Sequence, residues 1–407
     1  MAAVTLDFVQ TVAFAGLVLF GGYWLKRRIP LLARYNIPAP VVGGLPVAAV
    51  LAALYLSGSQ PLVFDTALQT PLQNTFFASV GFGASVRLLR RGGPLVAVMM
   101  GLASLAAACQ NVLGALVASA LGEHPLMGVL AGSVTLTGGP ATGLAFAPLF
   151  ESAGVDGAAT LAVSAAMVGI VSGGVIGGPI GTWLLGRHGG PSPRAARVPI
   201  EQLAEAQVDE PATATPAGED VEAYQLLKHL VLMVTAVGVG AWVSAGFATL
   251  GWTLPAYIGA MVVAAVIRNV DDAVGAIGIS QRAVDDLGTV ALSIFLVMAL
   301  MTLRLWQLAG TVVPLLVILA AQVAFVAFLC LFVVPRLMGR DYEAVVMATG
   351  FCGFMLGTTA NAVANMGALV ERYGPAPRAY LVVPLVGAFG IDFVNALLIT
   401  AAINLLQ

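Results

Sequence analysis

Long apolar stretches separated by short polar segments make up nearly all of this chain. A transmembrane helix needs roughly 20 mainly apolar residues, and this length defines the candidate spans. The first half of the chain supplies the stretches 8–25, 39–57, 72–86, 94–121, 126–149 and 158–185; the second half supplies 224–247, 253–267, 287–303, 308–334, 344–369 and 379–405. The pattern therefore predicts an all-α polytopic membrane protein.

Composition agrees with a chain surrounded by a lipid bilayer. Hydrophobic residues make up 59% of the sequence and charged residues 9%, whereas a soluble domain carries roughly 25% charged residues. The mean hydropathy is +0.95. Cys109, Cys330 and Cys352 lie inside apolar stretches and lack the spacing of a metal or redox motif. We expect no nucleic-acid partner. We interpret 8–25 as a first transmembrane span and not as a cleaved signal peptide, because no basic segment precedes it.

Two stretches, one in each half, are interrupted in the same way. The stretch 126–149 contains TLTGGPAT from position 135, and the stretch 344–369 contains GTTANAVAN from position 357. The same number of residues separates Glu151 from Glu371 and Gly154 from Gly374, which follow the two stretches. A duplicated, interrupted hydrophobic segment is typical of the binding site of a secondary transporter.

Positive charges indicate whether the interrupted stretches cross the membrane or return to the side from which they enter. Lys and Arg gather in short cytoplasmic loops. If both stretches are re-entrant hairpins and the N-terminus is outside, every one of the 18 Lys and Arg residues except Arg304 lies on the cytoplasmic side. If both stretches cross the membrane, the same residues divide almost evenly. The sequence therefore predicts two re-entrant hairpins, with both termini outside the cell.

Five crossings in each half force the second half to enter the membrane inverted relative to the first. We expect a first repeat over 1–186 with its hairpin at 126–149, a cytoplasmic linker over 187–222, and a second, inverted repeat over 223–407 with its hairpin at 344–369. The proline-rich, acidic sequence of the linker is typical of a solvated segment. Hairpins that enter from opposite sides can meet near the membrane midplane, an arrangement that suits alternating access.

Asp392 is the only acidic residue deep within a predicted span. A carboxylate there costs several kcal/mol unless a cation or hydrogen-bond donors meet it. We expect Asp392 to bind Na⁺, to carry a proton, or to face an ammonium group of the substrate. The alternative is a structural carboxylate bonded to a neighbouring helix end. Asn395 follows about one helical turn later and therefore lies on the same face.

The interrupted segments supply hydroxyl, amide and glycine residues that suit a site for Na⁺ and an anion. Sodium binds neutral oxygens together with the free carbonyls of broken helices, and glycines let backbone N–H groups face an anion. The alternative is close helix packing through small residues. The candidate site consists of Thr135, Thr137, Gly138, Gly139, Thr142, Gly357, Thr358, Thr359, Asn361, Asn365, Asp392 and Asn395, with Gln110 and Asn111 to complete it. No Lys or Arg lies deep in a predicted span, so backbone N–H groups, hydroxyls and a co-bound cation would hold an anionic substrate.

A series of short motifs occurs along essentially the whole chain. They include IPAPVVGGL from Ile37, Gln110-Asn111, IGGP from Ile176, VVPLVGAF from Val382 and IDFVNAL from Ile391. In these motifs the chain resembles the bacterial sodium/glutamate symporter family. The resemblance implies a homodimeric secondary transporter of the bacterial inner membrane, and not an enzyme. It also implies that glutamate moves inward with Na⁺ as the coupling ion, by an elevator-like motion of the part that carries the hairpins.

The chain departs from this family at both hairpins. The family usually has Gly-Gly-His-Gly-Thr where this chain has Gly138-Gly139-Pro140-Ala141-Thr142, and Thr-Pro-Thr where this chain has Thr359-Ala360-Asn361. Proline removes an N–H donor, and alanine limits the left-handed turn that glycine allows. We expect cation coupling to survive these changes, whereas the substrate is glutamate or a related small anionic amino acid, carboxylate or other metabolite.

Two other classes of protein fit the sequence less well than a transporter. A passive channel would also accommodate symmetry-related halves, although the sequence lacks the charged rings that such pores often carry. An intramembrane enzyme would use Asp392 as an acid or base, but no second deep carboxylate, histidine or nucleophile accompanies it. The sequence has no Walker motif, Rossmann fingerprint or G-x-S-x-G motif that would indicate ATP-driven transport or hydrolysis.

Overall fold

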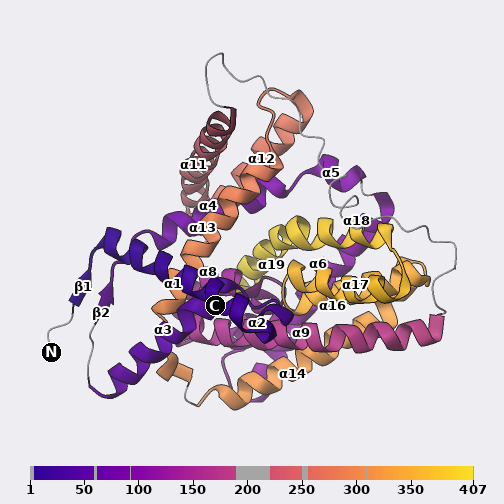
Figure 1. The fold of residues 1–407 in the computed structure, drawn as a ribbon, viewed down its shortest axis with the longest axis horizontal. Coiled ribbons are helices and arrows are strands. Elements are labelled where there is room, and N and C mark those ends of the chain that lie inside the picture. The colour runs from indigo at the N-terminus through magenta and orange to yellow at the C-terminus, as the bar shows by residue number, and fades with distance from the viewer. Residues whose placement is uncertain are drawn as a thin grey trace. The chain divides into compact units, whose positions relative to one another are not determined.

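The computed structural model describes residues 4–58, 62–91, 93–188, 221–249, 255–308 and 310–406. Helices account for nearly all of these residues (Figure 1). Among them, seven helices are long and apolar enough to span a membrane: Phe8–Arg28, Ala39–Leu56, Gly93–Ala120, Ala158–Arg187, Ala223–Phe247, Gln281–Met301 and Val312–Met338. The prediction of a helical protein with many apolar spans is confirmed.

The chain forms two compact units that interleave its sequence halves. Unit 1 contains Met1–Gly83, Asp156–Leu161 and Ala212–Val312, and unit 2 contains Ala84–Val155, Ala162–Pro211 and Val313–Gln407. Each unit therefore combines helices from both halves. The predicted boundaries at 186 and 223 divide the chain into sequence repeats, and they stay a prediction. Positions 189–220 of the predicted linker lie outside the described residues.

Unit 1 contains the opening helices of each sequence half. Its elements are α1 (Phe8–Arg28), α2 (Pro30–Arg34), α3 (Ala39–Leu56), α4 (Gln69–Gly83), α11 (Val221–Ala248), α12 (Ala256–Val274), α13 (Gln281–Met301) and the 3₁₀ helix η2 (Leu305–Leu308). A Cβ on Gly22 of α1 would overlap the Ala39 carbonyl oxygen of α3, and one on Gly240 of α11 would overlap the Ala260 nitrogen of α12. The first two long helices of each half thus cross through a glycine, which lets the backbones pack directly.

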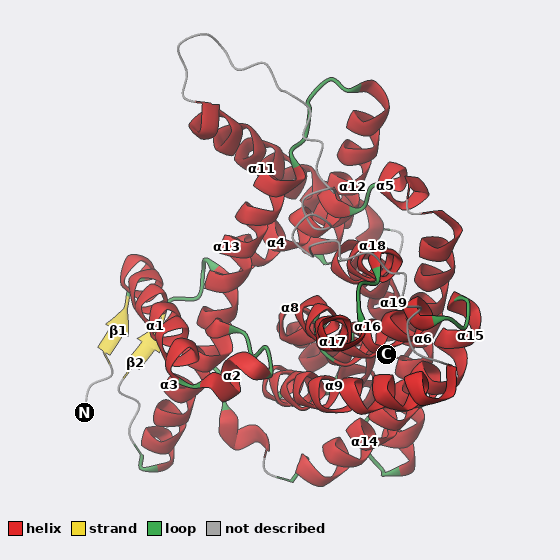
Figure 2. Cartoon of the chain, turned by 45° about the vertical axis from the view of Figure 1, so that its right-hand side comes forward, coloured by secondary structure: helices red, strands yellow, loops and turns green. Residues whose placement is uncertain are grey.

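One pair of three-residue strands departs from the all-α expectation. β1 (Val4–Leu6) and β2 (Leu62–Phe64) pair in parallel, and they form the only sheet among the described residues (yellow in Figure 2). The Thr11 hydroxyl reinforces the pairing by accepting a hydrogen bond from the Asp65 N–H at 3.1 Å. Three residues are too few for the pattern of apolar positions to indicate a strand in the sequence.

The helix α12 extends farther than the sequence predicted. The expected span ended at position 267, but α12 runs to Val274 and therefore carries Arg268 and Asp271. Arg268 is only 9% exposed and pairs with Asp272 at 3.1 Å. The Asp271 carboxylate accepts the backbone N–H groups of residues 277, 278 and 279 at 2.7, 3.1 and 2.9 Å. Burial alone would raise the pKa of Asp271, but these hydrogen bonds and the Arg268 charge lower it below its usual value.

Unit 2 contains both interrupted stretches. Its elements are α5 (Val86–Arg91), α6 (Gly93–Ala120), α7 (Pro125–Val129), η1 (Leu130–Val134), α8 (Gly139–Ser152), α9 (Ala158–His188, of which the first residues belong to unit 1), α14 (Val312–Phe328), η3 (Leu329–Val333), α15 (Val334–Met338), α16 (Tyr342–Leu356), α17 (Thr359–Tyr373), α18 (Pro377–Leu385), η4 (Val386–Gly390) and α19 (Ile391–Leu406). Fully buried aromatic side chains fill its interior, among them Phe146, Phe150, Phe351 and Phe354.

Three π-helical turns, η1, η3 and η4, interrupt the regular helices of unit 2. A π-helical turn holds one more residue than an α-helical turn and is often found at functional sites. The turn η1 lies in the first interrupted stretch, and η4 directly precedes Asp392. Two of the three therefore adjoin the predicted site.

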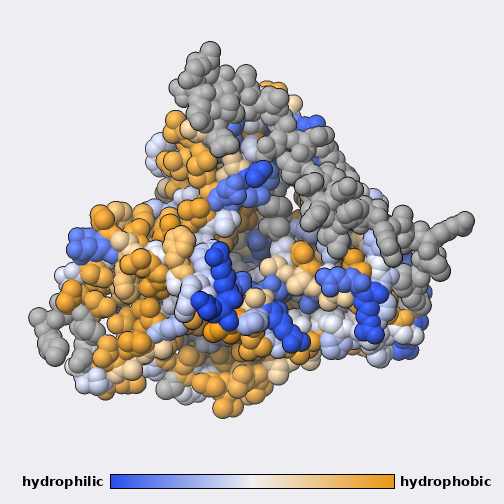
Figure 3. Space-filling view, in the orientation of Figure 1, coloured by the Kyte–Doolittle hydropathy of each residue, from blue (hydrophilic) through white to orange (hydrophobic). Residues whose placement is uncertain are grey.

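The surface is strongly apolar, as expected of a protein that contacts lipid. Leu17, Phe20 and Trp242 are 74%, 72% and 77% exposed. Figure 3 shows apolar side chains over wide areas of the face that it draws, with hydrophilic residues in smaller, separate groups. Apolar surface on this scale would be unfavourable in water, whereas lipid chains can cover it.

Candidate functional site

The first interrupted stretch consists of two helical arms joined by a non-helical segment in unit 2. Gly132 leaves the helical region with φ −98° and ψ −128°, and α8 begins at Gly139, whose φ of +70° favours glycine. The break therefore starts before the predicted Thr135, and Thr142 lies on α8 instead of in the break. Pro140 occupies the first turn of α8, where its missing N–H removes no helical hydrogen bond.

Ser133, at this break, binds two of the predicted amides. The Asn111 Oδ1 atom accepts hydrogen bonds from the Ser133 N–H at 3.2 Å and from its hydroxyl at 2.7 Å. The Asn395 amide nitrogen donates to the Ser133 carbonyl oxygen at 2.9 Å. All three side chains are buried. The break is thus held between α6, which carries Asn111, and α19, which carries Asn395.

Gln110 connects the first interrupted stretch to the second. Its Oε1 atom accepts a hydrogen bond from the Thr137 hydroxyl at 2.8 Å, and its amide nitrogen donates to the Met355 carbonyl oxygen at 3.2 Å. Met355 lies in the last turn of α16. On the other side, the amide nitrogen of Gln322 in α14 donates to the Gln110 carbonyl oxygen at 2.7 Å. The Thr135 hydroxyl makes only a local bond, to the Leu130 carbonyl oxygen at 2.8 Å.

The second interrupted stretch has a short break at Gly357 and Thr358. Gly357 adopts φ −159° and ψ −99°, and α17 begins at Thr359. The Thr358 hydroxyl caps α17 by accepting the Asn361 N–H at 3.4 Å. Asn361 and Asn365 therefore lie on a helix, although the sequence placed them in the break. A hydroxyl residue three positions before Asn361 provides a normal helix start, which explains why the break ends so early.

Side chains of α17 hold this helix to its neighbours. The Thr359 hydroxyl donates to the Gly387 carbonyl oxygen of η4 at 2.7 Å. The Asn361 and Asn365 amide nitrogens donate to carbonyl oxygens of residues 170 and 173 in α9, at 2.8 and 3.1 Å. Glycine at position 177 leaves the space that the Asn365 amide occupies. This glycine therefore lets α17 pack closely against α9.

The tips of the two interrupted stretches are in contact. A Cβ built on Gly139 would lie 3.6 Å from the Gly357 carbonyl oxygen and 3.8 Å from the Thr358 Cγ2 atom. At Gly138 the Thr142 side chain fills the space that a Cβ would need. The two breaks, more than half the chain apart in sequence, thus form one neighbourhood, as the repeat pattern predicted.

Asp392 lies in the first turn of α19, directly after η4. Its side chain is half-buried, and it makes no hydrogen bond or ion pair within the part of the chain that the structure describes. Asn395, one turn farther along, is bonded to Ser133. Asp392 is therefore a carboxylate that has no partner among the described residues and that is close in sequence to Asn395.

Three buried amide oxygens near the breaks have no hydrogen-bond donor among the described residues. They are Oε1 of Gln322 and Oδ1 of Asn361 and of Asn395. An unpaired buried acceptor costs roughly 1–3 kcal/mol. Neutral oxygens of this kind are ligands that a hard cation such as Na⁺ accepts. We call the buried polar side chains near the breaks the polar cluster: Gln110, Asn111, Ser133, Thr137, Gln322, Asn361 and Asn395. The cluster offers cation ligands, and the helix breaks beside it offer backbone N–H groups.

Sequence reasoning missed two residues of this cluster, Ser133 and Gln322. Each was visible as a polar residue inside an otherwise apolar stretch. Ser133 precedes the predicted break by two positions, and Gln322 lies in a span that carried no other sign of function. No group of three or more His, Cys, Asp or Glu side chains suited to a transition metal occurs among the described residues.

Broken helices that meet tip to tip, with buried neutral oxygens near the breaks, define the kind of site found in secondary transporters. Comparison with known proteins specifies the family. The family model for sodium/glutamate symporters matches residues 4–375. The chain belongs to the sodium/glutamate symporter family.

Curated relatives match along nearly the full length. A sodium/glutamate symporter of Haemophilus influenzae is 40% identical over 407 residues, which cover 99% of each chain. A sodium/glutamate symporter of Escherichia coli K12 is 40% identical over 395 residues, which cover 97% of this chain and 96% of the relative. The family resemblance inferred from the sequence motifs is confirmed.

Proposed function

We propose that this protein is a secondary active transporter of the bacterial inner membrane that carries glutamate, or a related small anionic amino acid or carboxylate, into the cell together with Na⁺. Two observations support the proposal. The match to sodium/glutamate symporters extends over nearly the whole chain. The two helix breaks, where such transporters bind their cargo, are in contact and are lined by neutral oxygen ligands.

In this proposal the oxygens of the polar cluster bind Na⁺. The candidates are the free amide oxygens of Gln322, Asn361 and Asn395, with the Asp392 carboxylate close by along α19. The bound Na⁺ and the N–H groups at the starts of α8 and α17 attract the anionic substrate, because helix N-termini carry partial positive charge. Binding of Na⁺ then favours binding of the substrate, and binding of the substrate favours binding of Na⁺. This mutual effect is the basis of coupling.

The inverted repeat and the membrane topology belong to the same proposal. Equivalent glycine crossings at Gly22 in the first half and Gly240 in the second support an internal repeat. Pairing of β1 with β2 places Val4–Leu6 beside the segment that contains Asp65. Both segments would lie outside the cell if the hairpins at 126–149 and 344–369 are re-entrant.

An elevator-like motion and a homodimer complete the proposal. The division of the chain into two compact units, of which unit 2 holds all of the candidate site residues, suits a mechanism in which one unit carries the cargo. The homodimer depends on the family resemblance alone.

The experiment is uptake of radiolabelled glutamate by the purified protein in proteoliposomes. We expect accumulation against a concentration gradient when Na⁺ is higher outside, and no accumulation when choline replaces Na⁺. Uptake that persists after a sodium ionophore collapses the gradient would contradict Na⁺ coupling. Competition with aspartate and related dicarboxylates, on the wild type and on Asn361→Thr, would identify the preferred substrate.

A passive channel is the second candidate, and the same preparation distinguishes it. If the protein is a channel, we expect ionic currents across planar bilayers that correspond to rates far above the turnover of a carrier. We also expect no accumulation of substrate against a gradient. The lack of charged rings in the sequence favours the carrier.

A further inference from the structure

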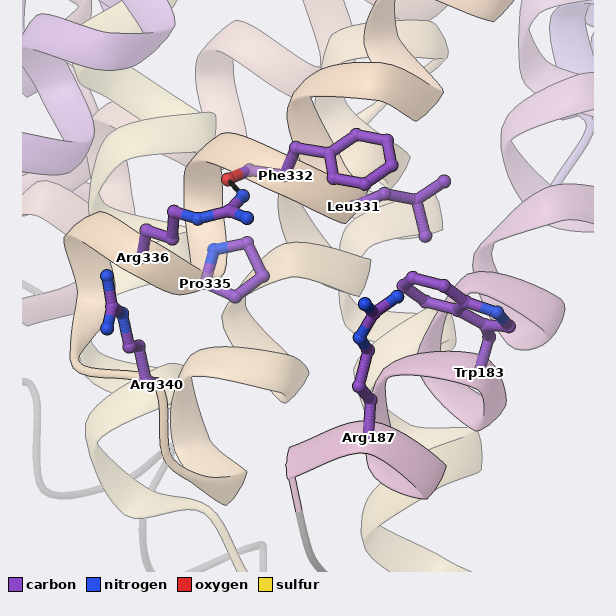
Figure 4. A pocket seen from close by; sticks show the side chains of 7 residues that line it. All are labelled: Trp183, Arg187, Leu331, Phe332, Pro335, Arg336 and Arg340. Atoms are coloured by element: carbon purple, nitrogen blue, oxygen red, sulfur yellow. Dashed lines mark hydrogen bonds between the residues drawn. The ribbon is translucent and has the colours of Figure 1, made fainter.

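A pocket of unit 2 with three arginines on its walls involves none of the candidate transport residues. Its volume is about 330 Å³. Trp183 and Arg187 of α9 form one side, and the other side comes from η3, α15 and the loop that follows; these residues are Leu331, Phe332, Pro335, Arg336 and Arg340 (Figure 4). No acidic residue lines it.

The three guanidinium groups are not neutralised by carboxylates of the described residues. None of them takes part in the ion pairs of this part of the chain, which involve Arg268 and Arg378. The Arg187 guanidinium lies over the Trp183 ring at 5.1 Å, and that of Arg336 lies 5.9 Å from the Phe332 ring centre. Arg336 also donates to the Phe332 carbonyl oxygen. Aromatic rings and a carbonyl oxygen orient these cations without removing their net charge.

The backbone around Arg340 is held in an uncommon conformation. Arg340 has φ +59°, in the left-handed region, and its N–H donates to the Pro335 carbonyl oxygen at 2.8 Å. A non-glycine residue rarely adopts this conformation. The turn directs the chain back across the end of α15, so that Arg340 joins Arg336 on the same wall of the pocket (Figure 4).

The pocket lies where two apolar spans end together. Ala158–Arg187 and Val312–Met338 are both candidate membrane helices, and the arginines occupy their last residues or follow directly. Trp183 and Phe332, farther inside the spans, are 45% and 38% exposed. Aromatic residues beside arginines are typical of the depth at which lipid chains give way to headgroups. One side of the pocket is therefore apolar and the other cationic.

We propose that this pocket binds the headgroup of an anionic phospholipid. The phosphate lies among the guanidinium groups of Arg187, Arg336 and Arg340, which match its oxygens by charge-assisted hydrogen bonds. The acyl chains lie along Trp183 and Phe332. A zwitterionic choline headgroup would place a cation against three arginines, so the pocket prefers phosphatidylglycerol. Basic pockets between membrane helices are a known way of holding acidic lipid headgroups.

Thermal unfolding of the detergent-solubilised protein tests the ligand. We expect short-chain phosphatidylglycerol to raise the melting temperature, because a ligand that binds only the folded state stabilises it. Short-chain phosphatidylcholine should give no comparable rise. Inorganic phosphate at the same concentration should also have little effect, since it lacks the acyl chains. A shift with phosphate as large as that with phosphatidylglycerol, or equal shifts with the two lipids, would overturn the assignment to an anionic lipid.

Arginine variants test the place of binding. The triple variant Arg187→Gln, Arg336→Gln, Arg340→Gln should weaken the apparent affinity for phosphatidylglycerol on the order of 100-fold, since each basic residue near an anionic lipid contributes about a fivefold factor. The matched control is Arg27→Gln, Arg282→Gln, Arg372→Gln, which removes the same charge from exposed positions and should keep the wild-type shift.

A conservative variant covers the case in which the pocket triple variant folds poorly. Replacement of the same three arginines by Lys keeps the charges and should retain most of the phosphatidylglycerol shift. Trp183→Leu should weaken binding while leaving the charges in place. Equal phosphatidylglycerol shifts in the wild type and in a folded pocket variant would disprove the site.

Discussion

Asn361, Asn395 and Gln322 each donate a hydrogen bond from the amide nitrogen to a backbone carbonyl, and their amide oxygens have no donor among the described residues. Natural proteins rarely leave a buried acceptor unpaired without a function. Neutral oxygens also suit a site that must release its cation, because they bind less strongly than a set of carboxylates. In the function proposed above, Asp392 contributes its charge to Na⁺ binding, separately from these neutral oxygens.

Asp392→Asn tests that role. The variant keeps the size of the side chain and removes its charge, so we expect the Na⁺ concentration for half-maximal uptake to rise at least ~10-fold, equivalent to about 1.4 kcal/mol of lost interaction. The measurement is glutamate uptake by proteoliposomes over a range of Na⁺ concentrations. Slow transport with an unchanged Na⁺ dependence would instead indicate a structural carboxylate.

Gln322→Leu tests a residue that only the structure revealed. The substitution removes one free oxygen and one hydrogen bond, and we expect the half-maximal Na⁺ concentration to rise several-fold while unfolding becomes easier by only about 1 kcal/mol. Thr400→Val is the matched control, because the Thr400 hydroxyl is buried but bonds only to its own helix. An equal change in Na⁺ dependence in both variants would count against a role for Gln322 in cation binding.

At the scale of single residues, the sequence could identify much of the polar cluster. Gln110, Asn111 and Asn395 stand out as amides inside apolar spans, and the structure connects all three to the first break. Gln322 could not be linked to them, because its contact with Gln110 depends on how α14 is rotated against α6. A periodic apolar pattern does not define that rotation when a helix is hydrophobic on all sides.

Close packing of α6 against α7 holds the first arm of the interrupted stretch. A Cβ on Gly128 would overlap the carbonyl group of Gly114. Gly128→Ala must therefore push the two backbones apart, and we expect it to lower stability by about 1–3 kcal/mol and to slow uptake. Thermal unfolding and initial uptake rates provide the measurements.

Gly101→Ala is the control for this change. Gly101 lies on α6, the helix against which Gly128 packs, with nothing within 4 Å of a built Cβ, so alanine should raise stability by up to about 1 kcal/mol. Equal effects of the two substitutions would show that helix propensity, and not the approach of α6 and α7, decides the result.

The turn between α12 and α13 depends on one carboxylate. Asp271→Ala leaves three backbone N–H groups without their acceptor, and we expect it to cost about 2–4 kcal/mol of unfolding free energy. Asp271→Asn should cost less, since its amide oxygen still accepts. The pKa of Asp271 is lowered from 3.8 in the folded protein, so the advantage of the wild type over Asp271→Asn is complete above pH 3.8.

This advantage should shrink as the pH falls below 3.8 and through the lower pKa of the folded state. Melting temperatures of both proteins in detergent, measured over a pH series, provide the comparison. A difference between the two proteins that does not change across this range would show that the charge of Asp271 contributes nothing.

At the scale of elements, the sequence located the helices better than their ends. The breaks at 126–149 and 344–369 were placed correctly as regions, but Thr142, Asn361 and Asn365 proved to be helical. A capping hydroxyl such as that of Thr358 defines where a helix restarts only once its hydrogen bond to the backbone is seen. Likewise α12 continues past its apolar segment because Arg268 and Asp272 pair with each other on the helix.

At the scale of the whole molecule, the orientation in the membrane is the main prediction. In a variant without Cys109, Cys330 and Cys352, we expect Asp65→Cys to react with a membrane-impermeant thiol reagent in intact cells. Ser192→Cys, in the predicted cytoplasmic linker, should react only after the cells are permeabilised. The charges of the short loops are the physical reason, since Lys and Arg are retained on the cytoplasmic side. The reverse pattern would contradict both the orientation and the re-entrant hairpins.

The sequence repeat could predict that the two halves share a pattern, but not how they would combine. Each compact unit takes elements from both halves, and the glycine crossings at Gly22 and Gly240 recur at equivalent places. Apolar spans show which residues avoid water, and they do not show which span packs against which. The packing partners are decided by the shapes of small residues at the crossings, and a single sequence does not reveal these shapes.

The π-helical turn η4 has a consequence for how insertions and deletions would act on this protein. Its extra residue determines which way each side chain of α19 faces, because each residue of an α-helix turns the chain by about 100°. Loss of one residue from Val386–Gly390 would restore an ordinary helix and leave the hydropathy of the segment almost unchanged. It would also rotate α19 by more than a quarter of a circle, carrying Asn395 away from Ser133 and Asp392 to another face. A deletion that leaves the hydropathy profile almost unchanged would thus break the contacts between α19 and the site.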